Sequence, residues 1–102
     1  MLFAFFCIDR PEAAAIRTGE LQVHRDYLRG VADRIAFAGP LLADDGKSLI
    51  GSLLAIDFDD ARAAQAWLDD EPYRRAGLFG SVEVRAFENR WPQRAGFPPD
   101  PK

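Results

Sequence analysis

The residue best suited to chemistry is His24, the single histidine of the chain. Between Leu21 and Ile35, apolar residues recur at helical spacing and His24 falls among them, which predicts a helix with its imidazole on the buried face. Near a helix N-terminus, backbone N–H groups disfavour a positive charge and favour a bound anion. A neutral imidazole placed there can act as a general base. The alternative is a core-edge histidine satisfied by one hydrogen bond.

Carboxylates that could act with His24 stand on two other segments. Glu71 comes just before a proline at the expected end of the second helix, and Asp9 follows the first expected strand. A carboxylate hydrogen-bonded to one imidazole nitrogen fixes the tautomer and raises the basicity of the other nitrogen. Glu71 is the preferred partner and Asp9 the second candidate. The alternative for Glu71 is a surface acid at a helix terminus.

Three further side chains are candidates for binding a substrate. Arg17, ahead of the helix, suits an anionic group, although it is equally typical of a solvated loop charge. Ser52 follows a glycine on an expected strand without the strained Gly-x-Ser-x-Gly turn of nucleophilic serines. We therefore expect a hydrogen-bonding or packing role for Ser52, not a nucleophile. Tyr73 is a candidate for either the core or the site.

The composition excludes several classes of protein. The chain has 102 residues, of which 48% are hydrophobic and 12% aromatic, which indicates one folded domain. Its net charge of −3 comes from interspersed charges, so we expect no nucleic-acid partner. The apolar run at the start is too short for a signal core or a membrane span, and a cytoplasmic protein is expected. One cysteine and one histidine cannot build a zinc site, and no phosphate loop is present, so neither a metal nor a cofactor is expected.

Hydrophobic periodicity and turn residues predict the elements that must position these side chains. They are a strand buried on both faces and central in space over Leu2 to Ile8, a loop or short helical turn to Gly19, a helix from Leu21 to about Ala36, an edge strand over Phe37 to Leu42, a hairpin turn at 44–47, a strand over Ser48 to Phe58, a helix from Asp59 or Asp60 to about Asp70, and a strand over Phe79 to Phe87. We expect Cys7 to be a small buried apolar residue, Gly39 to let another segment of backbone approach closely, and Arg25 to lie on the solvent face of its helix.

This order of elements is ferredoxin-like, βαββαβ: an α+β fold with an antiparallel sheet and two helices on one face. The domain should cover 1–88, followed by a proline-rich tail over 89–102. Both faces of the strand over Ser48 to Phe58 are largely apolar. Because helices cover one sheet face, we expect a second subunit on the other, and hence a homodimer.

The order and spacing of several motifs resemble the YCII-related family. These motifs are Asp9 after the first strand, Arg17, His24, Gly39-Pro40, Asp45-Gly46, Gly51-Ser52, Glu71-Pro72-Tyr73 and the segment 76–79. The resemblance covers roughly Leu2 to Phe87. It implies a dimeric α/β barrel, in which two such sheets pack face to face around a cleft, and a site built on a His/Asp pair. The family includes a dehydrochlorinase of chlorinated hydroxyquinols, and muconolactone isomerase resembles it in fold.

The resemblance assigns the catalytic pair to His24 and Glu71. Glu71 is a departure, because the family usually has aspartate there, and one extra methylene changes the reach to the imidazole. The expected function is a small cofactor-independent enzyme that uses acid/base chemistry, as an isomerase, lyase or dehydrochlorinase does, on a small aromatic or carbonyl-bearing molecule. Asp9, Arg17, Ser52 and Tyr73 would bind this substrate. The alternative is a non-catalytic dimeric module that binds a small ligand.

Overall fold

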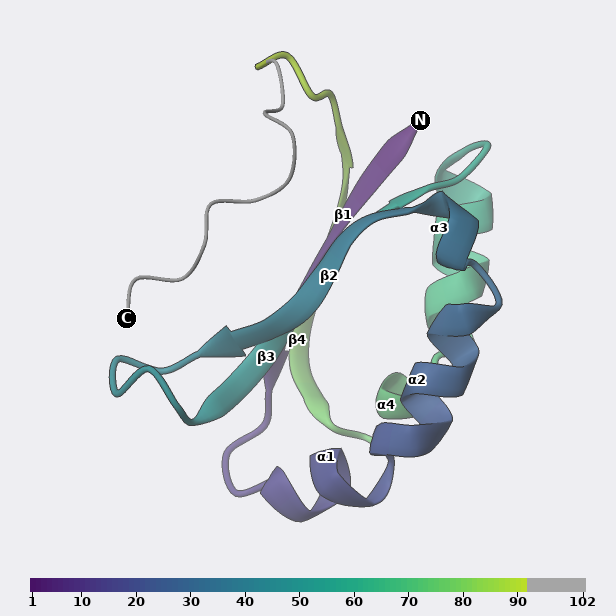
Figure 1. Cartoon of the computed structure of the whole chain (residues 1–102). Helices are drawn as coiled ribbons and strands as arrows, with labels where there is room; N and C mark the ends of the chain where they lie inside the picture. Colours follow the sequence, from purple (N-terminus) through teal and green to yellow (C-terminus); the bar gives the residue numbers. More distant parts are fainter. Residues whose placement is uncertain (92–102) are drawn as a thin grey trace.

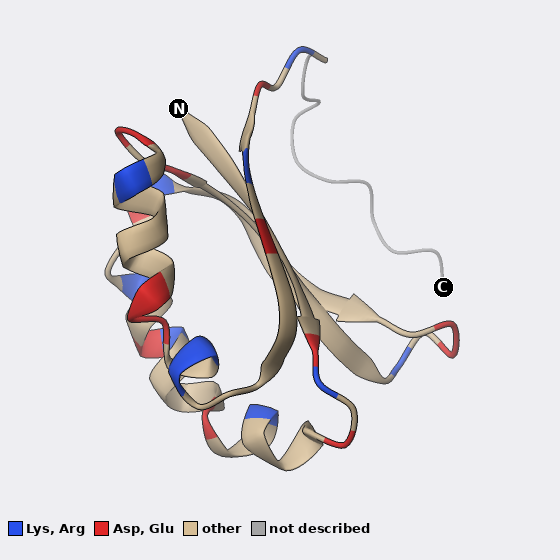
Figure 2. Cartoon of the chain, turned by 180° about the vertical axis from the view of Figure 1, so that it is seen from behind, with Lys and Arg blue, Asp and Glu red and all other residues tan. Residues whose placement is uncertain are grey.

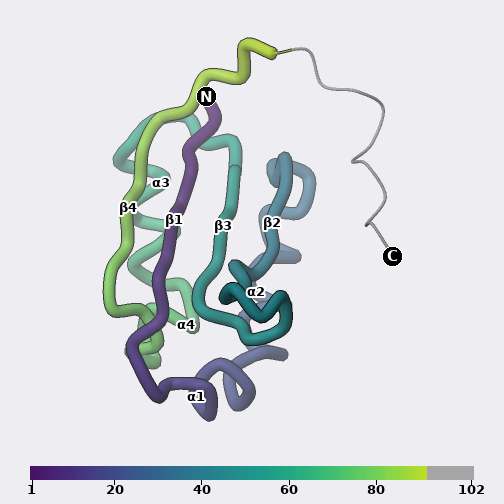
Figure 3. Tube along the Cα trace, turned by 90° about the vertical axis from the view of Figure 1, so that its left-hand side faces the viewer, coloured from purple at the N-terminus to yellow at the C-terminus, as the bar shows by residue number. Residues whose placement is uncertain are grey.

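A computed structural model describes residues 1–91 and shows a four-stranded antiparallel sheet with helices on one face (Figure 1). The strand order is β2-β3-β1-β4, which Figure 3 shows side by side. The elements are β1 (Leu2–Asp9), α1 (Ala14–Gly19), α2 (Leu21–Arg29), a 3-10 helix (Ala32–Arg34), β2 (Ile35–Leu42), β3 (Leu49–Asp57), α3 (Ala61–Asp69), α4 (Pro72–Arg75) and β4 (Phe79–Phe87). The predicted α+β fold is confirmed.

The main core lies between the sheet and the helices. Phe5 of β1 is fully buried, and its ring packs edge to face against Trp67 of α3, with ring centroids 5.4 Å apart. Phe5 pairs with Leu54 of β3 across the sheet, and both side chains are buried in the core. Strand β1 lies between β3 and β4, so the first strand is central, as predicted. Its predicted burial on both faces is wrong, because Phe6 on the face away from the helices is 45% exposed.

The first helical connection differs from the prediction at its end. Helix α2 stops at Arg29, and Gly30 donates its N–H to the carbonyl of Tyr27, so the predicted continuation to about Ala36 is wrong. Gly30 supplies the physical reason, since glycine is a poor residue for a helix interior. The apolar residues Val31 and Ile35 still pack on the core, but from the turn before the 3-10 helix and from β2. The predicted short turn before α2 is the six-residue helix α1.

The second helical connection begins where the sequence indicates. The carboxylate of Asp60 caps α3 by accepting the N–H of Ala63 at 2.8 Å. The chain then turns at Asp70 and Glu71 into the single turn of α4, with Pro72 at its first position. Proline is suited to a first helical position, where its missing N–H has no intrahelical partner. This turn brings Glu71 back under α2.

Strand β2 is an edge strand, as its Gly39-Pro40 pair predicts. The close approach of two strands, expected at Gly39, occurs instead at Gly51. A Cβ added at Gly39 would meet nothing within 4 Å, whereas one at Gly51 would lie 2.2 Å from the carbonyl oxygen of Cys7. Gly51, not Gly39, is therefore the residue that lets two strands pack closely, and the prediction for Gly39 is wrong. The buried thiol of Cys7 agrees with its predicted role as a small apolar residue.

The sheet face opposite the helices is uncovered by any other element of residues 1–91 (Figure 1). It presents Phe6 and neighbouring apolar residues of β1, β2 and β3, while charged residues lie mostly on helices, loops and β4 (Figure 2). No helix in this part of the chain is long and apolar enough to cross a membrane. The tail expected over 89–102 lies outside the described residues from 92 onward.

Candidate active site

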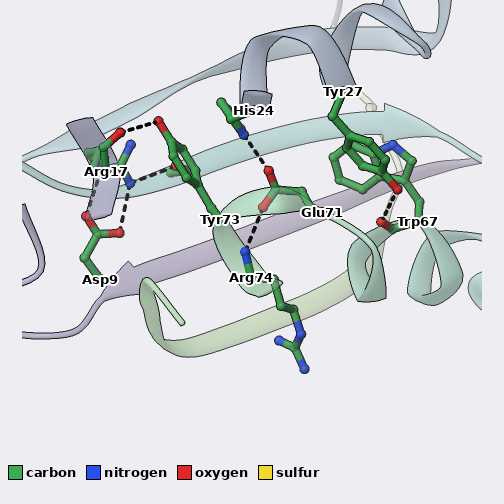
Figure 4. A network of polar contacts seen from close by, with 9 residues as sticks. Asp9, Arg17, His24, Tyr27, Trp67, Glu71, Tyr73 and Arg74 are labelled. Atoms are coloured by element: carbon green, nitrogen blue, oxygen red, sulfur yellow. Dashed lines mark hydrogen bonds and ion pairs between the residues drawn. The ribbon is translucent and has the colours of Figure 1, made fainter. Parts of the chain in front are cut away.

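His24 and Glu71 form a buried pair between α2 and the start of α4. His24 Nδ1 lies 2.5 Å from Glu71 Oε1, and the two residues are 9% and 1% exposed (Figure 4). The other oxygen, Glu71 Oε2, accepts the backbone N–H of Arg74 at 3.1 Å. Because an ionised carboxylate only accepts hydrogen bonds, His24 Nδ1 must donate. In neutral His24 the free nitrogen Nε2 then carries the lone pair.

Tyr73 holds the imidazole plane in place. Its ring stacks on His24 with centroids 4.0 Å apart and an interplanar angle of 14°. The Tyr73 hydroxyl donates to the backbone carbonyl of Arg17 at 3.3 Å, and Tyr73 is fully buried. Figure 4 shows the Tyr73 ring between His24 and the side chain of Arg17, whose Cζ lies 4.9 Å from the ring centroid. Tyr73 thus links the two charged parts of the site.

The second charged part is Arg17 with Asp9. Arg17 Nε and Nη2 donate to the two oxygens of Asp9, both at 2.8 Å, in a bidentate pair. Nη2 also donates to Ser52 Oγ at 3.1 Å. Asp9 at the end of β1 and Ser52 on β3 thereby fix the guanidinium from two strands. Since bidentate pairs are geometrically specific, Arg17 is held rigidly despite its long side chain.

A cleft of about 570 Å³ opens beside these groups. Its walls come from α1, α2 and the strands β2 and β3, where the helices leave the edge of the sheet uncovered. His24, Arg17, Ser52 and Tyr73 contribute to the lining, whereas Glu71 and Asp9 do not. The remaining wall is mainly apolar and includes Leu21, Leu28, Pro40, Leu49 and Leu54. This volume lies within the range of about 300–1,000 Å³ that is typical of small-molecule sites.

Burial and charge act together on the ionisable groups around the cleft. Burial lowers the pKa of Arg17, but the hydrogen bonds to Asp9 and the negative charge of Asp9 outweigh burial and raise this pKa above its usual value. The guanidinium therefore stays charged. Burial raises the pKa of Tyr73, which keeps its hydroxyl protonated as a donor. Burial, and then the charge of Glu71, raises the pKa of the Cys7 thiol beneath the site to about 12. Cys7 is therefore a neutral core residue and no nucleophile at neutral pH.

The structure brings together all six residues singled out in the sequence, as two pairs with Ser52 hydrogen-bonded to Arg17 and Tyr73 between Arg17 and His24. Glu71 contacts His24, while the second candidate, Asp9, contacts Arg17 instead. No hydrogen bond within residues 1–91 joins Ser52 to His24, so nothing there activates the serine. No three His, Cys, Asp or Glu side chains in this part of the chain converge as metal ligands do.

Sequence reasoning missed Arg25. Its position one residue after His24 placed it on the solvent side of the helix, yet it lines the cleft. The cleft lies open along the edge of β2, so a residue about 100° from His24 around the helix still reaches it. Leu21 and Leu28 were the available signal, because residues four before and three after Arg25 share its face of the helix.

Comparison with known proteins agrees with this architecture. Protein YciI from Escherichia coli O6:H1 is 30% identical over 95 residues, covering 86% of this chain and 97% of that protein. The same values hold for protein YciI of Shigella flexneri. A solved structure, 5-chloro-2-hydroxyhydroquinone dehydrochlorinase (TftG) from Burkholderia phenoliruptrix in complex with 2,5-dihydroxybenzoquinone, is also similar. Its TM-score is 0.81 at 26% identity, with 88% of this chain and 96% of that chain covered.

The match to a family extends over nearly the whole described structure. The YCII-related domain corresponds to residues 1–88, which contain all the strands and helices of the described residues and both pairs of the site. This chain belongs to the YCII-related domain family.

Proposed function

We propose that the cleft is the active site of a small cofactor-independent enzyme that moves a proton on an aromatic or carbonyl-bearing molecule. The observation that supports this most is the buried pair of His24 and Glu71, which leaves Nε2 of a cleft-lining imidazole free to accept a proton. The similar dehydrochlorinase, whose structure contains a dihydroxybenzoquinone, makes a lyase or isomerase reaction the favoured class.

The reaction begins with proton transfer from the substrate to His24 Nε2. The electron pair of the broken bond moves toward a carbonyl or ring oxygen, and the developing negative charge is met by the nearby guanidinium of Arg17. Glu71 compensates the positive charge that forms on the imidazole. The resulting anion either expels a leaving group such as chloride, as a lyase does, or accepts the proton back at another atom, as an isomerase does.

A homodimer forms part of the proposal. The open sheet face carries Phe6, at 45% exposure, and further apolar residues of three strands without cover from residues 1–91. Dimers of this kind typically bury on the order of 2,000 Å² in total. A second copy of this sheet, packed face to face, would remove that apolar surface from water. We place the working protein in the cytoplasm.

The test is a screen of purified protein against chlorinated hydroxyquinols, hydroxyquinones and unsaturated lactones, with His24→Asn alongside. General-base catalysis typically contributes about 10²- to 10⁴-fold in rate, so a genuine substrate should lose at least a hundredfold in kcat when His24 is replaced. The folded state of the variant is checked by its circular dichroism spectrum. Turnover that survives His24→Asn would refute the proposal. Binding without turnover of any compound would favour a non-catalytic ligand-binding module.

A further inference from the structure

The charges that line the cleft are all of one sign. Among the residues of its wall, Arg17 and Arg25 are cationic, His24 is the third basic group, and none is an aspartate or glutamate. The two carboxylates of the site stand behind this wall, each engaged with one of these basic groups. A molecule in the cleft therefore contacts basic side chains directly, while the two carboxylates lie behind them and do not line the cleft.

Arg25 is the cation of this wall with no partner inside the described chain. It is exposed, and no hydrogen bond or ion pair joins its side chain to any residue from 1 to 91. Its charge nevertheless acts on the buried Tyr73 hydroxyl, where it lowers the pKa against the larger effect of burial. Arg25 lines the cleft beside His24, and because its side chain has no partner in residues 1–91, its donors are available to a ligand.

Arg17 has one N–H group to spare. Its Nε and Nη2 are used by Asp9 and Ser52, whereas Nη1 carries two N–H groups, of which the Tyr73 hydroxyl can accept one. Because Arg17 lines the cleft, the other N–H group of Nη1 is available there for an oxygen that bears negative charge.

We infer, building on the proposed function, that the substrate is a small aromatic or unsaturated organic anion. Its carboxylate or phenolate oxygen is bound by Arg25 and reached by Nη1 of Arg17. Its flat apolar body lies against the leucines at 21, 28 and 49, and its reacting atom faces His24. Arg25 is then the residue that selects substrates by charge, in addition to the acid/base pair.

The inference is tested by binding, independently of turnover. Benzoate, benzamide and benzylammonium have the same ring and similar size but negative, zero and positive charge. Titration of each into the full chain, followed by calorimetry and by amide chemical shifts, should give benzoate at least about tenfold tighter than benzamide and benzylammonium weakest. Arg25→Gln should weaken benzoate about 3- to 10-fold and leave benzamide within twofold. Arg62→Gln is the matched control, since Arg62 is exposed on α3 away from the cleft.

Two results would overturn the inference. One is equal affinity for benzoate and benzamide, or no saturable binding of benzoate; the other is a loss of benzoate affinity no larger in Arg25→Gln than in Arg62→Gln. Either would leave the proposed proton transfer at His24 standing. Conversely, a charge preference that depends on Arg25, with turnover unaffected by His24→Asn, would refute the proposed function and leave the inference intact.

Discussion

Replacing Glu71 by glutamine keeps the shape of the side chain but cannot keep both of its hydrogen bonds. The two carboxylate oxygens accept from His24 Nδ1 at 2.5 Å and from the backbone N–H of Arg74 at 3.1 Å. Glutamine has one oxygen and one NH₂ group. If its oxygen faces Arg74, the NH₂ group turns to His24 and forces Nδ1 to accept, which places the imidazole proton on Nε2. If its oxygen faces His24, two N–H groups confront each other at Arg74.

The size of the effect follows from these two losses. A buried donor without a partner costs about 1–3 kcal/mol. The imidazolium also loses its counter-charge, and two unit charges about 4 Å apart at an effective dielectric constant of about 20 interact by roughly 4 kcal/mol. Part of that Coulomb energy is offset by the lower desolvation of a neutral partner. We therefore expect Glu71→Gln to lower kcat by about 30- to 1,000-fold, or roughly 2–4 kcal/mol.

Two measurements separate catalysis from stability. Steady-state kinetics should show the loss in kcat with a much smaller change in ligand affinity, and the ¹⁵N shifts of the His24 ring should show the proton moving from Nδ1 to Nε2. Glu12→Gln is the control, because Glu12 is exposed and has no hydrogen bond or ion pair within residues 1–91. Unchanged kcat in Glu71→Gln would show that the pair does not orient the imidazole. An unchanged tautomer would instead place the glutamine oxygen at His24 and the unpaired N–H groups at Arg74.

Three further predictions concern packing and assembly. Gly51→Ala places a Cβ 2.2 Å from the Cys7 carbonyl and should cost at least about 2 kcal/mol of unfolding free energy in urea, whereas Gly39→Ala, with open space around it, should be near neutral. Burial raises the pKa of Cys7 from 9.0 to about 12, so above pH 9 the thiol ionises in the unfolded chain before it does in the folded one. The free energy of unfolding should therefore fall by about 1.4 kcal/mol per pH unit toward pH 12. Cys7→Val should flatten this slope, and an equal slope in the variant would contradict the prediction. Phe6→Glu should turn a dimer into a folded monomer in sedimentation velocity; a wild-type monomer at micromolar concentration would rule out the dimer.

The fold was largely predictable because its signals are local. Alternating apolar residues give the strands, an Asp-Gly pair gives the hairpin, and Asp60 gives the cap of α3. Gly30 is also a local signal for the end of α2, but the apolar stripe that continues to Ile35 predicted a longer helix. Periodicity identified the residues that pack on the core, but it did not show that Ile35 packs there from a strand and not from the helix.

The candidate site was only partly predictable because its contacts join distant segments. The imidazole and its carboxylate are 47 residues apart, and nothing in their spacing selects Glu71 over Asp9; the family resemblance did. The Arg17 and Asp9 pair, and the stacking of Tyr73 on His24, depend on how α1 and α4 sit against the sheet end. Arg25 was missed because helical periodicity gives the direction of a side chain around the helix axis but not which edge of the sheet the helices leave uncovered. The cleft that Arg25 lines opens at that edge.

The most direct test of the account follows the proton itself. A compound from the screen is incubated in D₂O with wild-type protein and with His24→Asn, and NMR records both deuterium at its reacting carbon and its conversion. We expect His24→Asn to retain binding of the compound but to show less than about 1% of the wild-type rate of exchange or conversion. Exchange and conversion at the wild-type rate in His24→Asn would contradict the claim that Nε2 of His24, oriented by Glu71, removes the substrate proton.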